Sequence, residues 1–240
     1  MPMMHGLSYV TREPARTDAA DAPVLLLLHG FATYENHLLD LTQGFDPRLS
    51  VVAVRAPLRI GPGAYRWFYF DLVPGEAPRI NADEEAQSLR TLTAFVEALA
   101  ARHAPKRLYL LGHSQGGTMA LSIALTRPSL IAGCANVNGR ILPKIAAALP
   151  PPEALTGLPF FMGHGTENPI VPIAVGRRMR ARLEELGVDL THREYPIGHE
   201  ISAEALADVS EWLSAKLDEE GRSAGRSGTR RSSSHGRVPA

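Results

Sequence analysis

A chain of 240 residues, 45% of them hydrophobic, is long enough to bury one large core and fits one domain better than two. Lysine plus arginine and aspartate plus glutamate each number 25, so the formal net charge is zero and charge gives no reason to expect a nucleic-acid partner. The single cysteine, Cys134, excludes an internal disulfide, and its apolar neighbours predict a buried thiol.

The two ends of the chain differ in character. Residues 1–6 contain neither a basic nor an apolar stretch, and the apolar run 24–28 is far too short to cross a bilayer, so we expect a cytoplasmic protein without stable membrane insertion. Residues 221–240 hold five arginines and no acidic residue among serines and glycines, which predicts a disordered basic tail. The folded domain is therefore expected to cover residues 1–220.

In chain order, short apolar runs alternate with segments of helical periodicity. The predicted strands, the first of them an edge strand, are residues 7–11, 24–28, 50–54, 108–111, 130–137, 159–162 and 189–195. Helices are predicted between these strands; one begins near residue 81 with a capping-box pattern, one ends at Gly187, and the last begins at Ser202. This alternation predicts an α/β fold with a mostly parallel sheet and helices on both faces.

The segment 107–118 determines the expected chemistry. A short apolar run is followed by Gly-His-Ser-Gln-Gly (residues 112–116) and then by a helical pattern. A nucleophile elbow requires strand, tight turn and helix in this order, with glycines where a Cβ atom would collide with the neighbouring strand and helix. Ser114 is therefore the predicted nucleophile, at a helix N-terminus that stabilises a forming anion.

A serine hydroxyl needs a base within hydrogen-bond reach to act as a nucleophile at neutral pH. His199 follows the last predicted strand and precedes the last helix, which in an open α/β sheet puts it at the same carboxyl edge as Ser114. His29 and His164 end predicted strands and are expected to be structural. No histidines show paired ligand spacing, so neither a metal nor another cofactor is expected.

The third member of a serine triad orients the imidazole and stabilises its protonated form. The chain order of nucleophile, acid and histidine points to the loop after the strand 159–162. This loop reads Gly-His-Gly-Thr-Glu-Asn-Pro-Ile-Val-Pro over residues 163–172.

Several motifs in order carry a family resemblance. They are His-Gly-Phe at 29–31, Gly-Pro-Gly-Ala-Tyr-Arg-Trp-Phe at 61–68, Gly-His-Ser-Gln-Gly-Gly at 112–117, the loop 164–172 and Gly-His at 198–199. With these motifs the chain resembles, over roughly residues 22–216, the phospholipase/carboxylesterase family of α/β-hydrolases, which are small serine esterases and include acyl-protein thioesterases. The resemblance implies an α/β-hydrolase fold and ester hydrolysis.

One position departs from the family pattern. The family's triad aspartate corresponds to Asn168 here, and Glu167 stands one residue earlier. An asparagine carbonyl can accept the hydrogen bond from Nδ1 of the histidine, but it has no negative charge, and such a change in a serine triad costs about 10⁴ in kcat. The motif position favours Asn168 as the orienting residue, and the longer Glu167 side chain is the alternative.

The oxyanion of a tetrahedral intermediate needs two amide donors. The amide of Gln115, next to the nucleophile, is one, and the resemblance places the other at Phe31. The resemblance also implies that Tyr65, Trp67 and Phe68, from a long loop over residues 55–76 that is rich in glycine, proline and aromatic residues, line an acyl pocket. Packing beneath the loop is the alternative for these aromatic residues.

The sequence therefore predicts a serine carboxylesterase that cleaves a small-molecule ester or thioester through an acyl-enzyme intermediate. We expect a monomer or a homodimer. The alternative, based on Asn168, is a degenerate, weakly active or non-catalytic protein of hydrolase fold that binds an acyl ligand or a protein partner.

Overall fold

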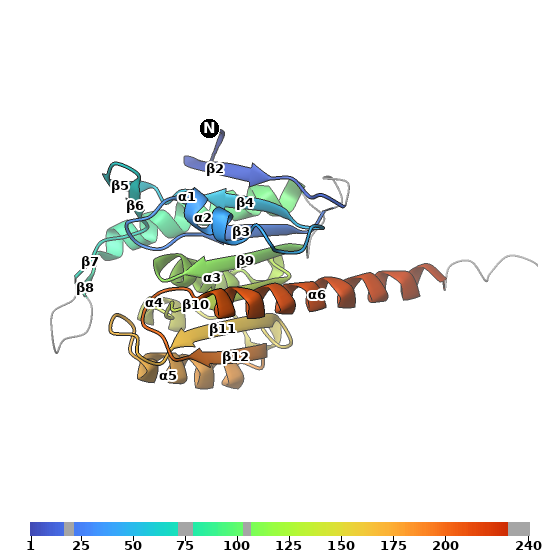
Figure 1. Cartoon of the computed structure of the whole chain (residues 1–240). Coiled ribbons are helices and arrows are strands. Elements are labelled where there is room, and N and C mark those ends of the chain that lie inside the picture. Colours follow the sequence, from blue (N-terminus) through green and yellow to red (C-terminus); the bar gives the residue numbers. More distant parts are fainter. Residues whose placement is uncertain (17–21, 72–78, 103–106, 230–240) are drawn as a thin grey trace, which may run out of the picture.

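The computed structural model describes residues 1–16, 22–71, 79–102 and 107–229. An eight-stranded sheet forms its centre, in the order β1-β2-β4-β3-β9-β10-β11-β12 (Figure 1). Only the β1-β2 and β2-β4 pairs of this sheet are antiparallel. The strands of the chain are β1 (Met3–Met4), β2 (Leu7–Arg12), β3 (Val24–Leu28), β4 (Ser50–Val54), β5 (Leu58–Gly61), β6 (Ala64–Arg66), β7 (Phe70–Asp71), β8 (Arg79–Ile80), β9 (Leu108–His113), β10 (Gly133–Val137), β11 (Pro159–Gly165) and β12 (Asp189–Tyr195).

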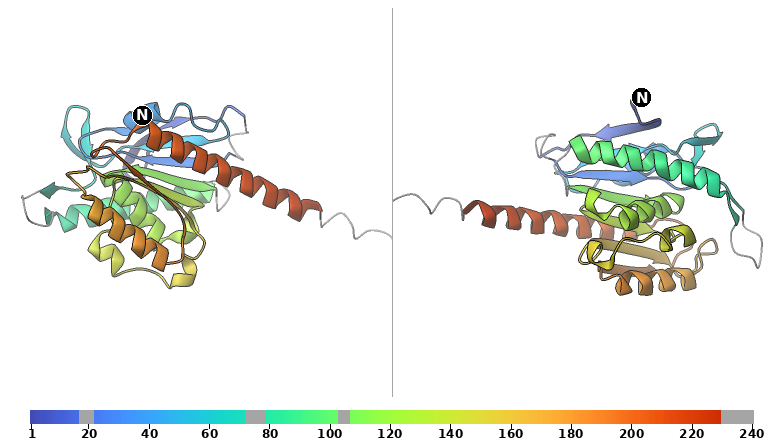
Figure 2. Two further views of the ribbon diagram at one scale, coloured as in Figure 1. Left: turned by 60° about the horizontal axis from the view of Figure 1, so that its bottom comes forward. Right: turned by 180° about the vertical axis from the view of Figure 1, so that it is seen from behind.

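Helices cover both faces of the sheet (Figures 1 and 2). They are α1 (Glu35–Leu41), α2 (Ala82–Arg102), α3 (Gln115–Thr126), α4 (Pro143–Ala146), α5 (Ile173–Glu185) and α6 (Ala203–Thr229). Leu38 of α1 and Val209 of α6 belong to one apolar cluster, whereas Phe95 of α2, Leu121 of α3 and Met179 of α5 belong to the other. The predicted α/β fold is therefore confirmed. In the described part of the chain, no helix has the length and apolarity needed to span a membrane.

The strand β3 shows why the sheet is buried on both sides. Its five residues are all buried, and successive side chains point to opposite faces. Leu25 and Leu27 pack in the cluster with α1 and α6, and Leu26 and Leu28 pack in the other. A continuous apolar run is thus what a strand needs between two helix layers. Cys134 of β10 is fully buried as predicted, and burial raises the pKa of its thiol.

Two predicted segments differ in detail. The strand expected at 130–137 starts later, because Pro128–Leu130 forms a 3₁₀ turn before β10. The loop expected at 55–76 contains the hairpin of β5 and β6, and β7 pairs with β8. Residues 72–76 of that loop lie outside the described residues.

The last helix begins as predicted but extends farther. The hydroxyl of Ser202 accepts a hydrogen bond from the amide of Ala205 at 3.1 Å, which caps α6. The Tyr109 hydroxyl donates to the Glu220 carboxylate, and beyond this contact the helix continues to Thr229. It therefore passes the boundary predicted at residue 220, and residues 221–229 are helical. Residues 230–240 of the expected tail lie outside the described residues.

The elbow between β9 and α3 has almost no spare volume. Ser114 has a positive φ of 55°, a strained value for a non-glycine residue. A Cβ atom on Gly116 would lie 1.9 Å from the carbonyl oxygen of Leu28, and one on Gly112 would lie 2.3 Å from the carbonyl oxygen of Gly116. The two glycines are therefore required for α3 to pack against β3 and β9.

Gly116→Ala should destabilise the protein by about 3 kcal/mol or more, because its Cβ atom meets backbone rather than a flexible side chain. Gly44→Ala is the matched control, since nothing lies within 4 Å of a Cβ atom there, and it should change stability by less than about 0.5 kcal/mol. Urea unfolding monitored by circular dichroism measures both. Equal stability of the two variants would contradict this account of the elbow.

Candidate active site

The carboxyl ends of neighbouring parallel strands bring three polar side chains together. The strand β9 leads into the elbow with Ser114, and the loops after β11 and β12 carry Asn168 and His199. Oγ of Ser114 lies 2.7 Å from Nε2 of His199, and Nδ1 of His199 lies 3.0 Å from Oδ1 of Asn168. The three side chains therefore form one hydrogen-bonded chain with the connectivity of a serine triad.

The hydrogen bonds of Asn168 determine which nitrogen of the His199 ring carries the proton. Oδ1 of Asn168 accepts the backbone amides of Ile170 and Val171 at 3.0 and 2.9 Å. Its Nδ2 donates to Oδ1 of Asn138 at 3.0 Å. The oxygen of Asn168 therefore faces the imidazole, so Nδ1 of His199 is the donor and Nε2 is the acceptor for the serine hydroxyl.

Asn138, which follows β10, sets the orientation of Asn168. Its Oδ1 also accepts the amide of Gly165 at 2.9 Å, and its Nδ2 donates to the carbonyls of His199 and Glu200 at 3.2 and 2.8 Å. The side chain is fully buried, so turning its amide over would place donors against donors and acceptors against acceptors. Asn138 thus connects the loops after β11 and β12.

Glu167, the alternative orienting residue, points elsewhere. Its side chain is exposed, and its backbone amide donates to the carbonyl of Ile197 at 3.0 Å. Nδ1 of His199 already has its partner in Asn168. The structure therefore brings Asn168, and not Glu167, into contact with the imidazole.

The environment of His199 favours the neutral imidazole. Burial lowers its pKa to about 4, and positive charge on His113, His164 or Arg140 acts in the same direction, whereas only Glu200 opposes the shift. A neutral ring can accept a proton from serine at pH 7. It is a weaker base than an imidazole that contacts a carboxylate.

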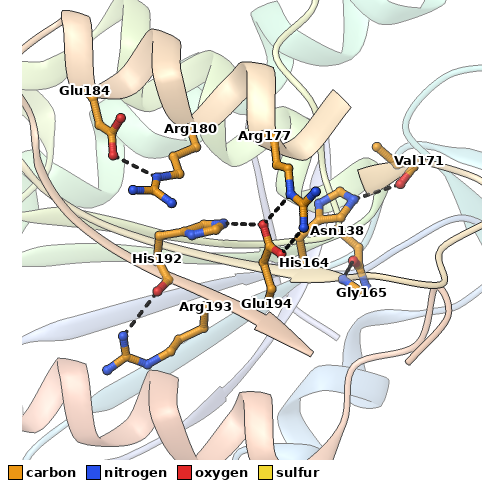
Figure 3. A network of polar contacts seen from close by, with 10 residues as sticks. All are labelled: Asn138, His164, Gly165, Val171, Arg177, Arg180, Glu184, His192, Arg193 and Glu194. Carbon is orange, nitrogen blue, oxygen red and sulfur yellow. Dashed lines mark hydrogen bonds and ion pairs between the residues drawn. The ribbon is translucent and has the colours of Figure 1, made fainter. Parts of the chain in front are cut away.

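The loop after β11 is held at both ends (Figure 3). Nε2 of His164 donates to the carbonyl of Val171 at 2.7 Å, and the amide of Gly165 donates to Asn138 at 2.9 Å. His164 is fully buried, and burial lowers its pKa. This arrangement gives His164 a structural role and fixes the loop that carries the third triad position.

His29 is also used within the fold. Its Nε2 accepts the amide of Ala56 at 3.0 Å, its Nδ1 donates to the carbonyl of Gly30 at 2.8 Å, and burial lowers its pKa to about 4. Among the residues that the structure describes, no three histidine, cysteine, aspartate or glutamate side chains lie close enough to hold a metal ion.

Two backbone amides are available as oxyanion donors. Gln115 is the first residue of α3, so its amide has no intrahelical acceptor. The amide of Phe31 has no hydrogen-bond partner within the described ranges, and Phe31 lines the same cavity as Ser114. The Gln115 side chain is fixed, because its Oε1 accepts the amide of Trp67 at 3.0 Å and its Nε2 donates to the carbonyl of Phe68 at 2.7 Å.

Of the three aromatic residues predicted to line an acyl pocket, Phe68 lies at a cavity beside Ser114. Trp67 is instead fully buried, and its Nε1 donates a hydrogen bond to the carbonyl of His29 at 2.9 Å. The ring of Tyr65 lies under the guanidinium of Arg55, 4.7 Å from its centre. Trp67 and Tyr65 therefore pack beneath the loop, which is the alternative that the sequence left open for them.

Two cavities adjoin the serine hydroxyl. The smaller, of about 30 Å³, is lined by Phe68 and Arg140 as well as Ser114. The larger, of about 270 Å³, is lined by Phe31 and His199 as well as Ser114. Ser114 therefore borders two spaces, one lined by the histidine and the other by the arginine.

Sequence reasoning missed Asn138 and Arg140. Both follow β10, which lies between β9 and β11 in the sheet. Polar residues just after a central parallel strand face the carboxyl edge, where ligands bind in open α/β sheets, and this position is the signal that identifies them.

The comparison with known proteins decides the family. The family model for phospholipases and carboxylesterases matches residues 15–217. The chain belongs to the phospholipase/carboxylesterase family. The α/β-hydrolase fold expected from the sequence motifs is thereby confirmed, and the crystal structure of esterase PE8 agrees with it: 26% identity, 87% of this chain and 98% of that chain covered, and a TM-score of 0.75.

Relatives in the family have been named as thioesterases and carboxylesterases. Acyl-protein thioesterase 1 of Neurospora crassa is 28% identical over 159 residues, which cover 63% of this chain and 65% of the relative. A probable carboxylesterase of Oryza sativa subsp. japonica is 30% identical over 159 residues, covering 64% of this chain and 66% of the relative. The chain thus matches slightly less than two thirds of the length of these relatives.

Asn168→Asp should raise kcat by about 10² to 10⁴, because a carboxylate stabilises the imidazolium that forms during the reaction. The same change places two acceptors about 3 Å apart, since a carboxylate oxygen replaces the Nδ2 that donates to Asn138. This repulsion should cost about 1–3 kcal/mol of stability and lower the Tm by roughly 2–10 °C. Ester hydrolysis and thermal unfolding measure the two effects.

Glu167→Gln is the control for that experiment. It removes an exposed carboxylate next to position 168 and should change kcat less than about twofold. A folded Asn168→Asp variant whose kcat does not rise, together with a large loss in Glu167→Gln, would show that Glu167 already supplies the charge.

Proposed function

We propose that this chain is a serine carboxylesterase that cleaves ester or thioester bonds through an acyl-enzyme intermediate. The observation that carries the proposal is the 2.7 Å hydrogen bond between Oγ of Ser114 and Nε2 of His199, at the N-terminus of α3. Family membership and the names of the relatives support it.

In the first half of the reaction, the Ser114 hydroxyl attacks the carbonyl carbon while Nε2 of His199 takes its proton. The amides of Phe31 and Gln115 donate to the oxygen of the tetrahedral intermediate, and the dipole of α3 stabilises its negative charge. His199 then gives the proton to the leaving group, and the bond to that group breaks. The acyl group remains on Ser114.

In the second half, His199 takes a proton from water, the resulting hydroxide attacks the acyl-enzyme, and the acid is released as the proton returns to Ser114. Asn168 keeps the imidazole in the productive tautomer throughout. It provides no negative charge, so we expect a slower enzyme than one with an aspartate at this position.

The alternative of a non-catalytic binding protein depends on Asn168 alone. A serine and a histidine in hydrogen-bond contact, with free amides beside them, are what hydrolysis needs, and a protein that only binds needs none of these. The names of the thioesterase and the carboxylesterase reported above also favour an enzyme. A cytoplasmic location and a monomeric or homodimeric state stay predictions from the sequence.

Ser114→Ala should lower the rate of p-nitrophenyl acetate hydrolysis by about 10². Loss of the serine in a full triad costs about 2 × 10⁶ in kcat and loss of the aspartate about 3 × 10⁴, so an enzyme without the aspartate has about 10² left to lose. Turnover by purified protein, with a thermal unfolding control, measures this. Equal rates for the two folded proteins would refute the serine mechanism.

The protein should keep its esterase activity in mild acid. Hydrolysis requires neutral His199, whose pKa is lowered to about 4, so activity is lost as the pH falls through that value and not near the ordinary histidine pKa of about 6.5. The profile of kcat/KM against pH, with circular dichroism at each pH to monitor folding, tests this. An acid limb near pH 6.5 in the folded protein would contradict the assignment of the base.

A further inference from the structure

Arg140 lies beside the nucleophile and has no anionic partner among the residues that the structure describes. It follows β10, and its backbone amide donates to Oγ1 of Thr118 at 3.2 Å, one helical turn from Ser114. Within the described part of the chain its guanidinium makes one hydrogen bond, from Nη2 to the carbonyl of Ile170 at 3.0 Å. The side chain lines the smaller cavity together with Ser114.

Several arginines of the described chain are paired with carboxylates, whereas Arg140 is not. Arg55 contacts Glu35 at 2.6 Å, and Arg66 contacts Glu84 at 3.0 Å. Within the described ranges, no carboxylate lies within 4.0 Å of the Arg140 guanidinium.

A partly buried guanidinium remains charged, and its cost of desolvation is offset only when an anion or several acceptors surround it. Arg140 is partly buried, and burial lowers its pKa, yet a single carbonyl accepts from its five N–H groups. Arg140 lines a cavity that Ser114 also lines, so a substrate bound at Ser114 can supply further acceptors. A substrate carboxylate satisfies both the charge and the planar donor geometry of this group.

The positions of the two cavities determine which part of the substrate carries this carboxylate. The leaving group receives its proton from His199, so it must lie in the larger cavity, which His199 lines. The acyl group then extends into the smaller cavity toward Arg140. That cavity is the smaller of the two, about 30 Å³ against about 270 Å³, which favours a short acyl chain.

We propose that the preferred acyl group is short and ends in a carboxylate that binds Arg140, so the substrate is a half-ester or half-thioester of a small dicarboxylic acid. This proposal rests on the proposed esterase function. It adds Arg140 as the residue that determines acyl specificity.

The substrate carboxylate also compensates for the missing triad aspartate. When His199 becomes an imidazolium, Asn168 offers it no negative charge, and the nearby positive charge of Arg140 opposes its protonation. A bound carboxylate neutralises Arg140 and removes that opposition. The correct acyl group should therefore increase kcat as well as lower KM.

The test compares monoethyl succinate with ethyl succinamate, which has the same shape but an uncharged amide in place of the carboxylate. Release of ethanol gives kcat/KM for both. The wild-type protein should prefer monoethyl succinate by about tenfold to hundredfold, the range expected for a charge-assisted arginine contact. Arg140→Gln should reduce this ratio to near one, and Arg140→Lys should retain part of it, because lysine keeps the charge but not the planar donors.

Arg178→Gln is the matched control, because it removes an exposed arginine of α5 that lines neither cavity, and it should keep the wild-type ratio. Thermal unfolding shows whether Arg140→Gln is folded, and if it is not, a reduced ratio in Arg140→Lys decides the question. O-acetylglycolate and O-acetylglycolamide form a second pair, with the charge on the leaving group.

The outcomes separate this proposal from the proposed function. Ser114-dependent hydrolysis of both ethyl esters with a ratio near one overturns the acyl specificity and leaves the esterase function standing. A charge preference only in the glycolate pair, or one that survives in Arg140→Gln, also overturns it. Failure of the wild-type protein to hydrolyse any of the four esters overturns the esterase function and the specificity with it.

Discussion

The hydrogen bond between Oδ1 of Asn168 and Nδ1 of His199 is the interaction on which the site depends. It joins the loops after β11 and β12, and it leaves Nε2 of His199 free to contact Ser114. Asn138 stabilises it from β10 by holding Asn168 in one orientation and by binding the carbonyls beside His199. The parallel sheet thus supplies a nucleophile, a base and an orienting residue from three of its strands.

An amide in place of a carboxylate changes the electrostatics of the triad while keeping its geometry. The site orients the imidazole as an aspartate would, but Asn168 brings no negative charge to the ring, and burial together with the positive charge of Arg140 lowers the pKa of His199. These surroundings favour the neutral ground state and oppose the imidazolium of the transition state. A substrate that brings its own negative charge corrects this imbalance, which gives the unpaired arginine and the triad asparagine one common explanation.

The sequence predicted those parts of the site that depend on local pattern or on chain order. Ser114 follows from the glycines that its tight turn requires, and His199 follows from its place between the last strand and the last helix. The choice between Asn168 and Glu167 depends on the direction of a loop, which side-chain spacing does not determine. Trp67 was predicted to line the acyl pocket but is buried, because the sequence pattern of an aromatic residue in a long loop is the same whether the residue packs under the loop or lines a cavity. The position of Arg140 after a central strand could have been found in the sequence, but its lack of a carboxylate partner among the described residues is visible only in the structure.

The central claim is that Asn168 holds His199 as the tautomer with its proton on Nδ1, ready to take a proton at Nε2. The most direct measurement is ¹⁵N NMR of histidine-labelled protein at pH 7, with His199→Gln to assign the signals. The account predicts a neutral ring with a protonated Nδ1 and an unprotonated Nε2, and replacement of Asn168 by alanine should weaken this preference. A neutral ring with its proton on Nε2, or a ring that is already charged at pH 7, would contradict it.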